Sequence, residues 1–297
     1  MKLKFKTPAK VNLGLHIHRK REDGFHELET ILQMVSLYDE LELEPLSSGI
    51  ELECDIPGIP TDSTNLAFRA AVLLQKACQV KNRGVRIRLK KNIPFGAGLG
   101  GGSSNAAGVL MGLNRLWDLN MRKEKLSILS SELGSDVPFF LTSPRAVGVG
   151  RGEQLEAIES HSKFKVLLVF PGFPISTPWV YQNLKLKLTK RENNISILRK
   201  NLSLSDIAGL GSRLYNDLEP VVIQRFPEIQ IIKGELQAQG ALGVLLSGSG
   251  SAVYGIYNDS EKAKLACTNL NGDWERIVTE TIGSFSEFLP KEILNYP

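Results

Sequence analysis

Residues 94–107 read Pro94-Phe95-Gly96-Ala97-Gly98-Leu99-Gly100-Gly101-Gly102-Ser103-Ser104-Asn105-Ala106-Ala107, with five glycines in seven successive positions. Glycine has no Cβ and tolerates φ > 0, so the backbone N–H groups of such a loop can converge on an anion. An apolar stripe at helical spacing follows the loop and predicts a helix, whose first-turn N–H groups and positive dipole end favour the same anion. The stripe consists of Ala106, Ala107, Val109, Leu110, Leu113, Leu116 and Trp117. We expect the loop to hold the phosphates of a nucleotide or another polyphosphate.

Other kinds of glycine loop fit less well. The loop contains G-x-G-x-x-G, the pattern of a dinucleotide-binding turn, but the preceding strand at 85–90 alternates apolar with basic residues instead of forming a continuous apolar run. The acidic residue expected about 20 positions later falls near Asp118, at the end of the helix pattern. No Lys-Ser or Lys-Thr follows the glycines, as it would in a Walker loop, and neither the V-A-I-K nor the H-R-D of protein kinases occurs. A flexible glycine linker is not normally followed by an amphipathic helix.

Length, charge and cysteine content set broad limits. The 297 residues suit two domains, which we place at 1–160 and 161–297. Three scattered cysteines form no C-x-x-C pair and four histidines lack zinc-site spacing, so we expect a reducing compartment and no structural metal. The sequence has no apolar run of 18 residues, and we therefore predict a cytoplasmic protein without a membrane span.

Six basic residues and no acid lie between positions 81 and 91, just before the glycine loop. A solvated strand face is the favoured explanation, and a field that attracts an anionic ligand is the alternative. No aromatic pattern for base stacking accompanies these charges, so we do not expect nucleic-acid binding.

Periodicity divides the chain into two mixed halves. Alternation at period two predicts strands through most of residues 3–53, and then come expected helices at 65–76 and 123–133 and strands at 85–90, 145–149 and 165–170. The segment 184–205, rich in Lys, Arg, Asn and Ser, is predicted to be a surface excursion. Beyond it we expect helices at 218–224, 228–239 and 259–270 and strands at 242–247, 252–257 and 275–281. This order of elements predicts a ferredoxin-like α+β sandwich for the second half.

Four features outside the loop could carry chemistry. Asp136 lies between a helix end and a proline, where an acid held stiffly among apolar neighbours suits a proton acceptor, although a capping or turn Asp is the simpler interpretation. Lys10 lies among apolar strand residues and could pair with an acid or a phosphate. His26 follows a turn and could make two directed hydrogen bonds. The glycine-serine run 247–251 is either a hairpin turn or a second loop that faces phosphate.

Taken together, these segments resemble the GHMP kinases. Three motifs match in order: Pro8-Ala9-Lys10-Val11-Asn12-Leu13, the glycine loop 94–107, and Leu246-Ser247-Gly248-Ser249-Gly250-Ser251-Ala252. The turn 21–26 and the segment 171–178 are similar to those of the isoprenoid-pathway branch of this family, and the resemblance runs from about residue 2 to residue 281. It implies an α+β fold with an N-terminal half like ribosomal protein S5 domain 2, a ferredoxin-like C-terminal half, and an active site in the cleft between them.

The resemblance also implies a reaction: ATP-dependent phosphorylation of the 2-hydroxyl of 4-diphosphocytidyl-2-C-methylerythritol, with Mg2+ bridging the ATP phosphates. Asp136 would accept or orient the hydroxyl proton, and Lys10 would hold Asp136 ionised and offset charge on the transferring group. The residues implied for ATP are Asn65, Lys91, Pro94, Gly96, Gly98, Gly100, Gly101, Gly102, Ser103 and Ser104. Those implied for the substrate are Asn12, Phe25, His26, Thr177 and Tyr181, with His26 on the cytosine edge and Phe25 and Tyr181 stacked on the ring.

One departure from the family concerns substrate affinity: Phe25 stands where the family usually has Tyr, so a hydrogen bond from that hydroxyl is lost. Three rival functions remain open. They are another small-alcohol kinase of the mevalonate or homoserine type, a nucleotide-binding regulator without catalysis, and an RNA-binding protein. The presence of both Lys10 and Asp136 argues against the regulator.

Overall fold

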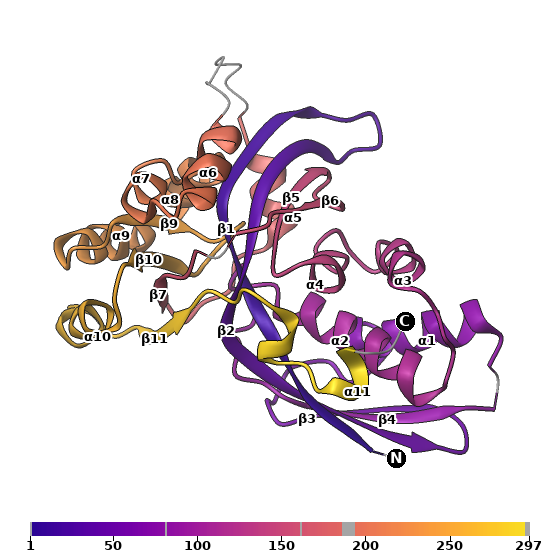
Figure 1. Ribbon diagram of the computed structural model, residues 1–297. Coiled ribbons are helices and arrows are strands. Elements are labelled where there is room, and N and C mark those ends of the chain that lie inside the picture. Colours follow the sequence, from indigo (N-terminus) through magenta and orange to yellow (C-terminus); the bar gives the residue numbers. More distant parts are fainter. Residues whose placement is uncertain (1, 81, 161, 186–193, 295–297) are drawn as a thin grey trace.

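The computed structural model describes residues 2–80, 82–160, 162–185 and 194–294, and its larger sheet is built on two long strands (Figure 1). β1 and β2 pair antiparallel along almost their whole length, and the sheet has the order β3-β4-β2-β1-β8, with β5 added to β2 and β6 to β5. Its strands are β1 (Leu3–Lys20), β2 (His26–Leu46), β3 (Ile50–Cys54), β4 (Gly84–Lys90), β5 (Arg145–Gly150), β6 (Gln154–Ala157) and β8 (Tyr215–Asn216). The alternation at 3–53 therefore belongs to three strands.

Helices cover one face of this sheet, as the right-hand part of Figure 1 shows. They are α1 (Leu66–Cys78), α2 (Gly101–Leu116), α3 (Lys123–Ser130) and α4 (Phe139–Thr142). α2 lies very close to the strands, because a Cβ on its Gly112 would stand 2.3 Å from a methyl carbon of Leu43. The close contact accompanies the burial of most of the apolar stripe that the sequence predicted.

The second sheet is ferredoxin-like, as predicted. Its strands are β7 (Lys165–Phe170), β9 (Gly243–Leu246), β10 (Val253–Tyr257) and β11 (Glu275–Glu280). They are antiparallel in the order β11-β7-β10-β9, which places the fourth, first, third and second strands side by side. α8 (Glu219–Arg225), α9 (Glu228–Ala238) and α10 (Ser260–Asn269) pack on one face of this sheet, and their buried residues form one apolar cluster with it.

The other face of the second sheet packs on β1 of the first. Tyr254 of β10 is completely buried there, and its hydroxyl donates a hydrogen bond of 2.7 Å to the backbone oxygen of Asn12. β8 extends the larger sheet with residues of the second half, and the last helical turns, η1 (Phe285–Glu287) and α11 (Lys291–Leu294), return to the α2 side (Figure 1). The boundary between residues 160 and 161 stays a prediction.

The expectation of a surface excursion at 184–205 was wrong for its second part; residues 186–193 lie outside the described residues. α6 (Asn194–Ser203) places Ile195, Leu198 and Leu202 in the core between the two sheets. These three apolar residues stand at i, i+3 and i+7 among polar neighbours, so the segment has a narrow helical stripe that its overall polarity hides. α5 (Thr177–Asn183) and α7 (Ile207–Gly211) are the remaining helices of this half in the described residues.

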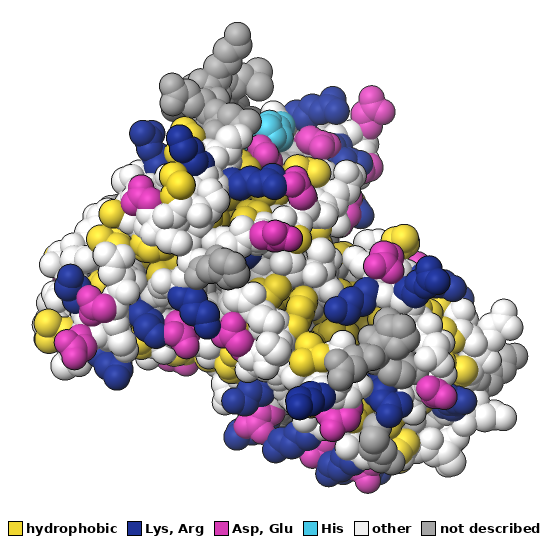
Figure 2. Space-filling model, in the orientation of Figure 1, with side chains coloured by type: hydrophobic (Ala, Val, Ile, Leu, Met, Phe, Trp, Pro, Cys, Tyr) yellow, Lys and Arg dark blue, Asp and Glu magenta, His cyan; other side chains and the backbone are white. Residues whose placement is uncertain are grey.

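Arg86, Arg88 and Lys90 of the basic run form a solvated strand face on β4, as favoured from the sequence, whereas the side chain of Lys91, after the strand, is 8% exposed. Arg88 of β4 donates to Glu42 and Glu44 of β2 and to Glu53 of β3, at 2.6 to 2.9 Å. Figure 2 shows basic and acidic side chains interspersed over the visible face of the molecule. The charges of these three side chains are therefore largely neutralised by their neighbours on the sheet.

Among the residues that the structure describes, no helix combines the length and the apolar character needed to cross a membrane. The cytoplasmic location and the absence of nucleic-acid binding stay predictions.

Candidate active site

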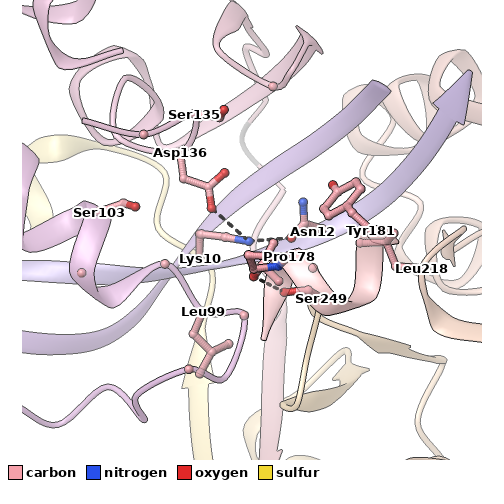
Figure 3. Close-up of a pocket in the computed structure, with 18 of the residues that line it drawn as sticks. Lys10, Asn12, Leu99, Ser103, Ser135, Asp136, Pro178, Tyr181, Leu218 and Ser249 are labelled. Carbon is pink, nitrogen blue, oxygen red and sulfur yellow. Dashed lines mark hydrogen bonds and ion pairs between the residues drawn. The ribbon is translucent and has the colours of Figure 1, made fainter. Parts of the chain in front are cut away.

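A cavity of about 960 Å³ opens where the glycine loop, β1, the tip of the β1–β2 hairpin and α5 meet (Figure 3). It brings together residues from both halves of the chain that lie far apart in sequence. Of the residues singled out by the sequence, those that line it are Lys10, Asn12, Phe25, His26, Lys91, Pro94, Gly96, Gly98, Gly100, Gly101, Gly102, Ser103, Asp136, Thr177 and Tyr181. These residues therefore face one continuous space.

The glycine loop packs backbone to backbone on the loop that joins β9 to β10. Gly98 has φ +75°, and a Cβ on it would stand 2.1 Å from the backbone oxygen of Ser247, so both its conformation and its surroundings require glycine. The Ser247 hydroxyl in turn donates to the backbone oxygen of Gly98 at 3.0 Å. Gly248 and Ser249 of the second loop line the cavity. Whether that loop faces phosphate stays a prediction.

The first turn of α2 opens on the cavity. Its N-cap is Gly100, at φ 71°, and no side chain caps the helix. The N–H groups of a first turn have no partner within their own helix, so here they are donors for a ligand, together with the dipole. The backbone N–H of Lys10 donates to the oxygen of Leu99 at 2.9 Å, which ties β1 to the loop. The arrangement has the features of an anion site: an uncapped helix start that is tied to β1.

Lys10 and Asp136 face each other at the middle of the cavity, as Figure 3 shows. The Lys10 Nζ lies 3.6 Å from an Asp136 carboxylate oxygen. The lysine side chain is 4% exposed, whereas that of the aspartate is 41% exposed, so the carboxylate is the partner open to a ligand. Asn12 Oδ1 accepts from Lys10 Nζ at 2.7 Å, and Asn12 Nδ2 donates to the Thr30 hydroxyl at 2.9 Å. This chain of hydrogen bonds fixes the direction of the ammonium group.

The outer end of the cavity is lined by rings. The His26 and Tyr181 rings lie 5.1 Å apart between centroids at 35°, and the Arg151 guanidinium lies 4.8 Å from the centre of the Phe25 ring. Burial, with a smaller contribution from the Lys20 charge, lowers the pKa of His26. Burial and then the Asp136 charge raise the pKa of the Tyr181 hydroxyl, which therefore keeps its proton at neutral pH. The end offers flat apolar surfaces beside an uncharged imidazole.

Thr177 connects the second half to this cavity. It is the first residue of α5, and its hydroxyl lies 2.7 Å from that of Ser249. Ser176 caps the helix by accepting from the Trp179 N–H. The cap sets the start of α5, and the helix then carries Tyr181 toward the hairpin tip.

Two of the implied ATP residues do not line the cavity. Asn65 is the N-cap of α1: its side chain accepts from the Ala67 N–H at 2.9 Å and donates to the Pro60 oxygen at 2.7 Å. Ser104 is buried in α2, and its hydroxyl has no hydrogen-bond partner among the described residues. A role for either toward ATP stays a prediction.

Two residues that the sequence did not single out belong to the site or its support. Arg151 lines the cavity, and Asp39 holds Lys91 from behind it. The acid of Asp39 stands in an alternating strand pattern between Tyr38 and Glu40, where it reads as another surface charge. Arg151 follows a glycine in a hairpin turn, and no local signal sets it apart. Only the fold shows that these residues meet the motifs.

The comparisons with known proteins concern nearly the whole chain. The models of the GHMP kinases N-terminal domain and of the GHMP kinases C-terminal domain match residues 65–143 and 198–276. A 4-diphosphocytidyl-2-C-methyl-D-erythritol kinase of Syntrophus aciditrophicus is 46% identical, covering 92% of this chain and 96% of its own. One of Acetivibrio thermocellus is 40% identical, covering 94% and 99%.

Solved structures of similar proteins have the same fold as this chain. A 4-(cytidine 5'-diphospho)-2C-methyl-D-erythritol kinase superposes with a TM-score of 0.82 at 37% identity, covering 95% of this chain and 100% of its own. A homoserine kinase from Cytophaga hutchinsonii has a TM-score of 0.77 at 18% identity, covering 95% of each chain, and shares the fold alone. The two-part α+β fold expected from the sequence is thereby confirmed.

Proposed function

Because the chain belongs to the GHMP kinase family, we propose that it transfers the γ-phosphoryl group of ATP to the 2-hydroxyl of 4-diphosphocytidyl-2-C-methyl-D-erythritol, a step of the non-mevalonate route to isoprenoid precursors. The observation that carries the proposal is the position of the Lys10–Asp136 pair. It lies in one cavity between an anion-binding helix start and a ring-lined end. The two relatives named above, both 4-diphosphocytidyl-2-C-methyl-D-erythritol kinases, are 46% and 40% identical over more than nine-tenths of the chain.

Asp136 is the proposed proton acceptor. As the substrate oxygen attacks the γ-phosphorus and the bond to ADP breaks, the hydroxyl proton passes to a carboxylate oxygen of Asp136. Its partial exposure makes that oxygen accessible to an incoming hydroxyl, and Lys10 holds it from the buried side. The Lys10 ammonium, fixed by Asn12, also offsets negative charge on the transferring group. Such transfer depends mainly on positioning and charge stabilisation, which this arrangement supplies.

ATP fits the helix start, where the uncapped first turn of α2 and the glycine loop offer backbone donors for phosphates. Lys91 adds a cation there. Among the described residues no group of three His, Cys, Asp or Glu side chains could hold a metal ion. Mg2+ keeps several waters and takes other oxygens from the phosphates, so the Ser103 hydroxyl, which lines the cavity at the start of α2, would be available to it as a protein ligand. When bound, it would neutralise charge on the phosphates.

The ring-lined end is proposed to hold the cytosine. Tyr181 and Phe25 offer aromatic faces for stacking, and His26 offers a hydrogen bond to the edge of the base. Asn12 lies next to Lys10 and would contact the erythritol portion, and Thr177 lines the same cavity. The Arg151 guanidinium lies over the face of the Phe25 ring, 4.8 Å from its centroid.

The decisive experiment is a phosphoryl-transfer assay with purified protein and four acceptors: the cytidylyl substrate, its uridylyl analogue, mevalonate and homoserine. We expect turnover of the cytidylyl form and a kcat/KM at least about tenfold lower for the uridylyl form, because the two bases differ in their hydrogen-bonding edges. Equal kcat/KM for the two nucleotidyl forms would remove the cytidine assignment. Preference for mevalonate or homoserine would assign the chain to another branch of the family.

A further inference from the structure

A buried carboxylate lies behind the ATP end of the cavity. Asp39 on β2 is 0% exposed. One of its oxygens accepts from the backbone N–H groups of Asn92 and Ile93 at 2.8 and 2.9 Å. The other accepts from Asn105 Nδ2 at 2.9 Å and from the Lys91 ammonium. Four donors thus converge on one acid, and a buried charge with such a full set of partners is a strong constraint on their positions.

The lysine that Asp39 holds belongs to the cavity wall. The side chain of Lys91 is 8% exposed and lines the cavity. Its Nζ also donates to Asn105 Oδ1 at 2.9 Å, and a Cβ on Gly101 would stand 3.2 Å from that Nζ. The ammonium therefore lies against the first residue of α2, next to the uncapped N–H groups. Asn105 is held in turn by Thr7, which accepts from its Nδ2 at 2.8 Å.

We infer that Asp39 is a positioning residue for nucleotide binding and that it acts through Lys91. β2 supplies the acid, the segment after β4 supplies the cation, and α2 supplies the amide that touches both. Asp39 fixes the ammonium at the helix start and ties the beginning of the glycine loop to β2. The inference rests on the proposed function in taking this end of the cavity as the nucleotide end, but it does not depend on the identity of the acceptor.

The test is calorimetric titration of the purified protein with ADP, without any acceptor. Asp39→Asn keeps an oxygen for the two backbone N–H groups and removes the charge that faces Lys91. We expect the Kd for ADP to rise about tenfold or more. Glu40→Gln is the matched control: this acid is the next residue on β2 and pairs with Lys4 and Lys90 at the surface, so the ADP affinity should not change.

An electrostatic alternative predicts the opposite sign. If Asp39 only offset the positive charge of Lys91, its removal would leave a free cation near the phosphates and tighten ADP binding. Unchanged or tighter binding by a folded Asp39→Asn variant would therefore overturn the inference. The double variant with Lys91→Met gives a second readout. In the Lys91→Met protein we expect Asp39→Asn to change the Kd for ADP by less than about twofold, because the group through which Asp39 acts is gone. If instead the fold-changes of the two single variants multiply in the double variant, Asp39 has an independent, purely structural role, and the inference is overturned.

If Asp39→Asn does not fold, Asn105→Ala tests the same inference with a milder change. Asn105→Ala removes the amide that touches both charged groups, leaves the two charges balanced, and is a favourable helix substitution. We expect a rise of about threefold in the Kd for ADP, and an unchanged value would contradict the inference. An effect on ADP binding without turnover of the cytidylyl substrate would leave this inference standing and reject the proposed substrate.

Discussion

The two ends of the cavity are lined by different kinds of chemical group. The proposed ATP end is made of backbone N–H groups and of a cation held by the buried Asp39. The substrate end is made of side chains on two turns and a short helix, and its Phe25 is 52% exposed. Backbone geometry demands glycine at fixed positions, whereas a ring-lined pocket demands only that suitable surfaces meet. The first end therefore leaves a dense local signal in the sequence and the second does not.

This difference predicts that variants of the two ends change different constants. Changes at the glycine loop should act on ATP, changes at the rings should act on the acceptor, and changes at the Lys10–Asp136 pair between them should act on turnover. A variant at one end that changed mainly the KM of the substrate assigned to the other end would contradict this division of the cavity.

The largest effect is expected for Asp136→Asn, because the change removes the charge and the proton acceptor with little change in volume. We expect kcat to fall at least about 100-fold, with the Kd for ADP near that of the wild type. Single-turnover kinetics and ADP titration measure the two quantities. Near-normal turnover in the purified variant would remove Asp136 from the mechanism, and a large loss of ADP affinity would move it to the ATP end.

Gly98→Ala should come next. A methyl group there would stand 2.1 Å from the Ser247 oxygen in a backbone conformation that side chains rarely adopt, so the loop must shift. We expect the KM for ATP to rise about tenfold or more while the acceptor KM changes little. Gly234→Ala in α9 is the control, because a Cβ there meets no atom within 4 Å. An unaltered ATP KM in a folded Gly98→Ala protein would mean that the phosphates bind elsewhere.

The same contrast explains what the sequence could predict. The glycine loop, α2 and the order of elements in the second half follow local rules, and the structure has them close to the predicted residues. Asp39 could not be found, since its role comes from a register that places it under Lys91. The burial of α6 was missed because three apolar residues were outnumbered by polar ones. Long-range pairing decides the case of Asp39, whereas the signal of α6 is local but weak.

At the substrate end, Tyr181→Ala should raise the KM for the cytidylyl substrate about tenfold and leave the ATP KM nearly unchanged, because one stacking face is lost. Tyr181→Phe keeps the ring and is the matched control, with an expected change below about twofold. Steady-state kinetics with each substrate varied in turn separates the two constants. An equal rise in both KM values would show a general collapse of the cavity instead of a local loss.

The smallest effect concerns the pH dependence of stability at the same end. Burial and Lys20 lower the pKa of His26, so below about pH 6.5, the ordinary pKa of histidine, the unfolded chain takes up a proton that the folded protein resists. The unfolded state then binds more protons, and the wild type should lose stability relative to His26→Gln as the pH falls from 7.5 to 5. The imidazole is only partly buried, so we expect a difference below about 1 kcal/mol. Urea denaturation of both proteins at the two pH values measures it. If the stability difference between the two proteins does not depend on pH, His26 titrates as it does in water. The ring-lined end would then be more open to solvent than the packing of the His26 ring on Tyr181 indicates.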